Sequence, residues 1–153
     1  MKIDKEVEPL VREALAASVA EEPDRFGNAL RAMSRNDEIA ARAFALAYAV
    51  DVGALLAVQD GEPPDEERLR YLASNFASTQ QWAGIDEGTT FTFLTSLAEN
   101  TSPVDSLPQG DAAIASFAIG GWLLSAFRIG DGISWTDLLD VILDRLESSS
   151  PQS

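Results

Sequence analysis

Two long apolar stretches dominate the pattern of hydrophobic and polar positions along the chain, at residues 39–58 and 112–127. Both are rich in Ala and Gly. As a helix, the first would be about 30 Å long, which is just enough to cross a bilayer, but it contains two charged residues. The second stretch is uncharged, but it is too short to cross a bilayer as a helix. A helix that is apolar all round is usually buried, so we predict two central core helices, at about 36–58 and 111–128, and no membrane segment.

Shorter amphipathic or capped segments predict the helices that surround this pair. Pro23 is placed for the first turn of one of them, because proline lacks the N–H that a first-turn position leaves unbonded. Residues 89–93 alternate between polar and apolar and could begin a strand, but the next five residues favour a helix, which we expect here. The expected ranges of the outer helices are 4–20, 23–33, 65–82, 89–98 and 134–147.

Capping and turn residues mark the expected helix boundaries. Ser34 with Asp37, and Ser134 with Asp137, have the spacing of a capping box, in which each residue bonds a backbone N–H of the other. Asp111 is placed to cap the second central helix. The glycines expected to end helices are Gly61, Gly130 and Gly132.

These elements predict an all-α fold, namely one helical bundle of six or seven helices that spans residues 1–147. The length is that of a single domain. The polar residues 148–153 are predicted to be a disordered tail. Residues 100–110, with two prolines, form the longest predicted loop and are therefore a candidate mobile or functional segment.

The composition removes the commonest catalytic chemistries. The chain has no His, no Cys and a formal net charge of −14. Thiol nucleophiles, thiolate metal sites and serine–histidine pairs are therefore excluded, and the charge opposes binding to nucleic acid. The sequence also lacks a glycine-rich phosphate loop. We expect a protein without enzymatic activity, cofactor or metal site.

Two further features bear on the setting of the protein. The charged N-terminus lacks the apolar segment of a secretory signal, so a cytoplasmic location is expected. Frequent Ala, with Arg supplying nearly all of the 11 positive charges, is typical of a GC-rich bacterial genome or of a salt-adapted organism. In a salt-adapted organism, the acidity would be an adaptation to the solvent rather than a binding surface.

Asp51 is the first candidate for a functional residue. At helical spacing it shares an apolar face with Phe44, Tyr48 and Leu55. A buried carboxyl group must be paired, hydrogen-bonded or protonated. One interpretation is a small-molecule pocket, with or without enzymatic activity, lined by Asp51, Tyr48, Phe44 and Arg128. The alternatives are a structural contact with Tyr48 or Arg128, or a cleft edge that is open to water.

The last predicted helix carries an acidic face. Asp137, Asp140 and Asp144 lie at spacings i, i+3 and i+7, and Glu147 continues the row. With a second helix of carboxylates, such a face could hold a divalent cation. Without one, it is a solvated face or a surface that steers a basic partner. Trp135 is the candidate interface anchor, because Trp is enriched among the residues that dominate binding energy.

The acidity is strongest in the second half of the chain, since residues 83–153 hold ten acids and two Arg. We therefore predict a non-catalytic protein of the inhibitor, immunity or regulatory type, which binds a basic partner protein through Trp135 and the acidic face. The alternatives are the small-molecule-binding domain at Asp51 and a structural homo-oligomer, such as a homodimer built on the Ala- and Gly-rich helices. A net charge far from zero is also explained by solubility alone.

Overall fold

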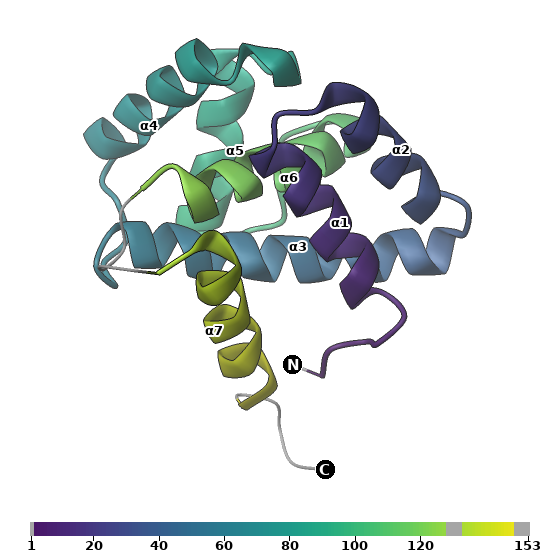
Figure 1. Cartoon of the computed structure of the whole chain (residues 1–153). Helices are drawn as coiled ribbons and strands as arrows, with labels where there is room; N and C mark the ends of the chain where they lie inside the picture. Colours follow the sequence, from purple (N-terminus) through teal and green to yellow (C-terminus); the bar gives the residue numbers. More distant parts are fainter. Residues whose placement is uncertain (1, 128–132, 149–153) are drawn as a thin grey trace.

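Seven α-helices form the described part of the chain, residues 2–127 and 133–148, in a computed structural model (Figure 1). The described residues contain no strand, so the all-α prediction is confirmed, including the helix at 89–98. The helices are α1 (Glu8–Val19), α2 (Pro23–Met33), α3 (Asp37–Val58), α4 (Glu66–Thr79), α5 (Glu87–Glu99), α6 (Gln109–Ser125) and α7 (Trp135–Ser148), with 3₁₀ turns η1 (Gln81–Ala83) and η2 (Pro103–Asp105).

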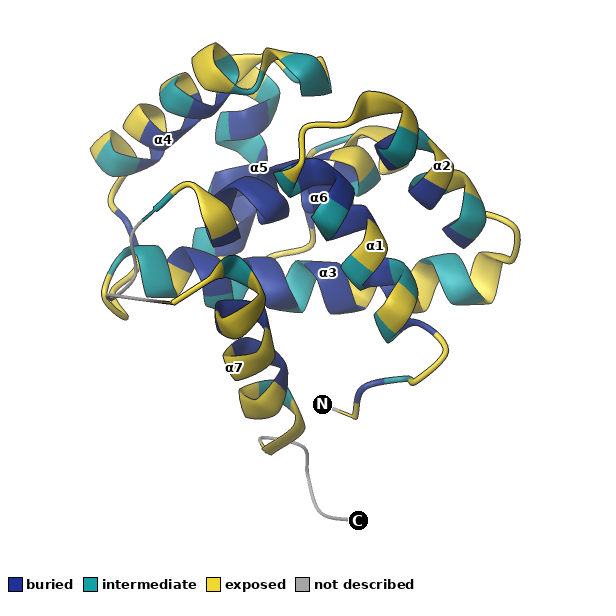
Figure 2. Cartoon of the chain, viewed as in Figure 1, coloured by how far each residue is buried: buried dark blue, intermediate teal, exposed yellow. Residues whose placement is uncertain are grey.

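All seven helices contribute to one hydrophobic core, but the two apolar helices occupy different positions in it. Eleven of the seventeen residues of α6 are buried, as predicted for a central helix. By contrast, α3 packs against α1, α2, α5, α6 and α7 with one side, while its other side is intermediate or exposed (Figure 2). By length and composition, α3 is the one helix in the described residues that could span a membrane. Of its 18 most apolar consecutive residues, 39% are buried in the bundle. The prediction of two central helices is confirmed, since α3 and α6 each pack against several other helices, but the outer side of α3 is more exposed than that of α6.

Two adjacent glycines allow α6 to pack closely between α3 and α1. A Cβ atom on Gly120 would overlap Asp51 Oδ1 of α3 and lie 3.0 Å from its Cγ. A Cβ atom on Gly121 would lie 2.7 Å from the Cβ of Ser18 on α1. The hydroxyl of Ser18 donates to the carbonyl of Ala118, 3.1 Å away. The close contacts on both sides of α6 therefore require the absence of side chains at these two positions.

Two predicted helix starts are corrected by the structure. Ser34 does not cap α3, because it ends α2 and its hydroxyl donates to the carbonyl of Leu30. The cap is Asn36, whose Oδ1 accepts from the backbone N–H of Glu38 (2.9 Å) and of Ile39 (3.2 Å). Likewise, α6 begins after Pro108, and Asp111 lies inside its first turn.

The second predicted capping box is confirmed at the start of α7. Ser134 Oγ accepts from the N–H of Asp137 (3.1 Å), and Asp137 Oδ2 accepts from the N–H of Ser134 (3.2 Å). This helix ends at Ser148, one residue inside the predicted tail. The remainder of that tail (149–153) and the predicted turn at Gly130 and Gly132 lie outside the described residues.

Two other helix boundaries differ from the predicted ones. The first helix begins at Glu8 rather than near residue 4. Residues 5–7 form turns in which the N–H groups of Val7 and Glu8 donate to the carbonyl of Asp4. The fourth helix ends at Thr79, three residues early, and the chain continues as η1 to a left-handed turn at Gly84 (φ 67°).

Candidate functional site

The acidic face of α7, formed by Asp137, Asp140, Asp144 and Glu147, is exposed. Asp137 is used in the capping box, and Asp140 Oδ1 accepts from Arg12 Nη2 of α1 at 2.6 Å. Asp144 and Glu147 make no ion pair within the described residues. Two of the four carboxylates therefore have structural contacts that hold α7 in place, and two are available to a partner.

Trp135 is half-buried and packs against the hydrophobic core from the first turn of α7. Its neighbours Leu138 and Leu139 are buried. The ring therefore exposes only part of its surface to a partner. The rest of the ring packs α7 against the bundle.

Asp51 is completely buried, and its carboxyl lies against Gly120 between α3 and α6. Neither carboxylate oxygen has a hydrogen-bond partner among the described residues, and the hydroxyl of Ser116, one turn before Gly120, also has none. Burial raises the pKa of Asp51 well above its ordinary value of 3.8. Because its charge has no partner among the described residues, burial disfavours the ionised form of this carboxyl.

The other residues of the predicted Asp51 pocket are directed elsewhere. The hydroxyl of Tyr48 donates to the backbone carbonyls of Ser96 (2.9 Å) and Thr101 (2.5 Å) rather than to Asp51. Its pKa is raised by burial and by the nearby Asp51. Phe44 lines a hollow of about 260 Å³ to which neither Tyr48 nor Asp51 contributes. Arg128 lies outside the described residues.

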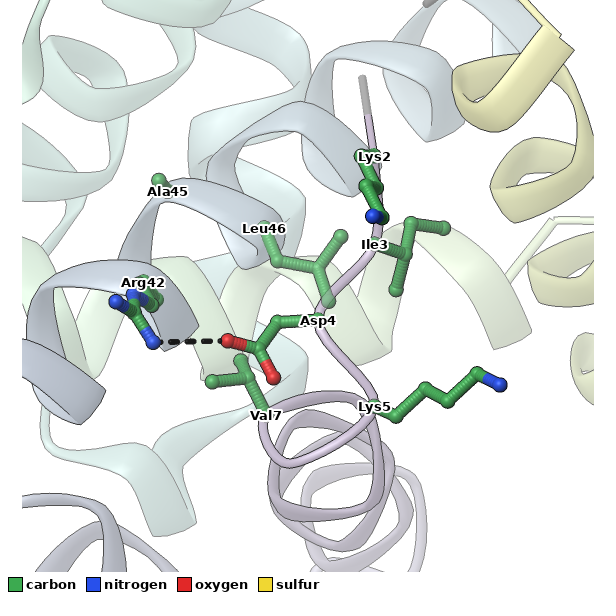
Figure 3. Close-up of a pocket in the computed structure, with 8 residues that line it drawn as sticks. All are labelled: Lys2, Ile3, Asp4, Lys5, Val7, Arg42, Ala45 and Leu46. Atoms are coloured by element: carbon green, nitrogen blue, oxygen red, sulfur yellow. Dashed lines mark hydrogen bonds and ion pairs between the residues drawn. The ribbon is translucent and has the colours of Figure 1, made fainter.

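The N-terminal segment and α3 enclose a pocket of about 640 Å³, lined by Lys2, Lys5 and Arg42 among others (Figure 3). Arg42 Nη1 bonds Asp4 Oδ2 at 3.0 Å and the guanidinium also pairs with Glu38, so two carboxylates balance its charge. Figure 3 shows the side chain of Lys5 directed away from this ion pair. The contacts of the pocket therefore fix the N-terminal segment against α3.

A second large concavity, which we call the α3–α7 groove, lies beside the acidic face and has a volume of about 610 Å³. Three of the six large hydrophobic side chains that are exposed in the described residues lie in it, namely Leu56 (36% exposed), Ile133 (51%) and Val141 (45%). Its full lining is Ala49, Val52, Gly53, Leu56, Ala57, Asp60, Gly61, Ile133, Leu138, Val141, Ile142, Arg145 and Leu146.

Gly53 lies against the side chain of Ile142 where α3 and α7 meet. A Cβ atom on Gly53 would lie 3.0 Å from Ile142 Cγ2, so a larger residue would require the Ile142 side chain to shift. Sequence reasoning did not identify this site. The available signals were the apolar residues on the outer side of α3 and Val141, which interrupts the acidic face between Asp137 and Asp144.

The chain matches no family model, no curated protein and no solved structure. Within residues 2–127 and 133–148, no three acidic side chains lie close enough together to hold a metal ion. The arguments about function therefore rest on the shape, polarity and charge of the described surface.

Proposed function

We propose that this protein is a non-catalytic, acidic interaction protein that binds a basic partner protein through the α3–α7 groove and the acidic face of α7. The observation that supports this proposal most strongly is the group of exposed hydrophobic side chains in the groove, Leu56, Ile133 and Val141. Exposed apolar side chains that gather in one concavity with a polar rim are typical of protein-binding sites.

The negative charge of the surface around the groove indicates that the partner is basic. Asp137 and Asp144 are the i−4 and i+3 neighbours of Val141, so carboxylates border the apolar side chain on the helix surface. With a net charge of −14, the whole molecule also attracts a basic surface and speeds association with it. The same charge repels a second copy of the chain and any nucleic acid.

Capture of a partner from a lysate of the source cell, with elution in a salt gradient, tests this proposal. The tagged full chain should retain a basic protein that elutes at moderate salt. Asp144→Lys with Glu147→Lys should move that elution to lower salt. The matched control is Glu99→Lys with Asp105→Lys, two exposed acids on other elements, which changes the net charge equally.

The comparison of the two double variants shows whether binding depends on the acidic face of α7 or on the net charge of the protein. If both shift the elution equally, the interaction reflects overall charge and the assigned surface is wrong. If the wild-type chain retains no basic protein at low salt, the proposed function is wrong, and the acidity is explained by solubility.

A further inference from the structure

We infer that the α3–α7 groove binds one amphipathic helix of the partner, with its apolar side chains facing the groove and Lys or Arg side chains on its flanks. This inference rests on the proposed function and names the segment that the site recognises. Recognition of a helix in an apolar groove is a recurring mode in which side chains at i, i+3, i+4 and i+7 serve as anchors.

The length of the groove fits about two turns of helix. On α3 its lining runs from Ala49 to Ala57. At 1.5 Å per residue, this distance is about 12 Å. A helix of that length presents about three apolar side chains along one face. The groove therefore accommodates a single short helix.

The walls and floor of the groove provide a suitable apolar surface. Leu56 and Val141 rise from α3 and α7 respectively, and Ile133 lies just before α7. The small side chains of Ala49 and Ala57 also line the groove and leave space above α3. Large apolar side chains of a partner helix can then lie between the three exposed hydrophobic residues.

The charges around the groove select basic flanks on the bound helix. Asp60 lines the groove just after the end of α3, and Asp144, which makes no ion pair within the described residues, borders Val141 on α7. Arg145 also lines the groove and makes no ion pair within the described residues, so it is available for a single acidic residue of the helix. A second copy of the chain would instead place its own acidic surface against these carboxylates.

The test uses the full chain and a designed peptide of about 18 residues. The peptide carries Leu at i, i+3, i+4 and i+7, one Glu, and Lys at the remaining surface positions, and its scrambled version has the same composition. Fluorescence anisotropy gives the affinity, and circular dichroism reports helix formation. We expect saturable binding with a gain of helix for the patterned peptide, and binding at least about tenfold weaker for the scrambled one.

Val141→Glu is the decisive variant, and Val104→Glu is its matched control. Both valines are 45% exposed, but Val104 lies in η2, outside the lining of the groove. Val141→Glu should weaken peptide binding about tenfold or more, although it adds a negative charge that would strengthen simple electrostatic attraction. Val104→Glu should leave the affinity unchanged. Ile133→Glu provides a second variant, at a position that is 51% exposed.

The possible outcomes separate this inference from the proposed function. If the Val141 and Val104 variants bind the peptide equally, or if the scrambled peptide binds as well as the patterned one, the helix site is wrong. A shift in partner elution by Asp144→Lys and Glu147→Lys would still support the proposed function in that case. If sedimentation shows a dimer that Val141→Glu dissociates, the occupant is a second copy of the chain, and the inference is overturned.

Discussion

At the residue scale, Asp51 of α3 lies directly against Gly120 of α6. The carboxyl occupies the space that a Cβ atom on Gly120 would need, and it has no hydrogen-bond partner in the described chain. Burial without a partner in the described chain raises the pKa of the acid and so favours its protonated form.

Replacing Asp51 should change how stability depends on pH. A carboxyl whose pKa is raised on folding contributes fully below its ordinary value of 3.8, and this contribution is lost as the pH rises through the folded-state pKa. The free energy of unfolding of the wild-type protein should therefore fall with pH above about 4 relative to that of Asp51→Asn, by at most about 1.4 kcal/mol per pH unit. Urea unfolding across this pH range measures the difference, and parallel profiles would contradict it.

Gly120→Ala should destabilise the protein by about 1–3 kcal/mol, since the new methyl group overlaps the Asp51 carboxyl. Gly110→Ala is the matched control on the same helix, because a Cβ atom there meets nothing within 4 Å. We expect this control to be neutral or to stabilise by up to about 1 kcal/mol. Thermal unfolding of both variants provides the comparison.

A double variant identifies the source of the clash. Combining Gly120→Ala with Asp51→Ser, which shortens the side chain, should cost less than the sum of the two single changes. Additive effects would show that Asp51 is not the group that excludes a side chain at position 120.

At the element scale, α7 is held by a capping box at its start and by the pairing of Asp140 with Arg12 along its length. Both partners of that ion pair are substantially exposed, so the pair contributes little stability by itself. The capping box and the buried leucines of α7 are the more important determinants of its position. Because α7 is one wall of the groove, its stability also affects binding.

Ser134→Ala should reduce stability by about 1 kcal/mol through loss of the cap. Hydrogen exchange should show faster exchange in the first turn of α7, because the N–H of Asp137 loses its acceptor. Ser106→Ala, at an exposed serine in the loop between η2 and α6, is the control and should change stability little. Equal stability of the Ser134 variant and this control would show that the box does not stabilise α7.

At the scale of the whole molecule, the large negative charge and the apolar groove should affect different kinetic steps. Attraction between opposite charges acts over roughly the Debye length, about 8 Å at physiological salt. We expect added salt to slow association with the patterned peptide and to leave its dissociation nearly unchanged, whereas Val141→Glu should mainly speed dissociation. Stopped-flow fluorescence measures both rates. A dissociation rate that rises as steeply with salt as association falls would contradict this division.

Features that depend on neighbouring residues were more predictable than contacts between residues far apart in the sequence. The seven helices follow from periodicity and capping, and the box at Ser134 and Asp137 was identified with the correct partners. The cap of α3 was misassigned to Ser34, because Asn36 offers the same chemistry two residues later. The acidic face was predicted, but its division into structural and free carboxylates was not, since Arg12 is 128 positions from Asp140.

The sequence by itself determined the helical class, the outer helices and the acidic face of α7, because these depend on neighbours within one or two turns. Only the tertiary structure decided that α6 is enclosed while α3 keeps an open side, since their compositions are similar and burial depends on which helices cover them. It also placed Asp51 against Gly120, and brought Val141 and Leu56 to the same groove. Such contacts join residues far apart in the chain, and local patterns contain no information about that pairing.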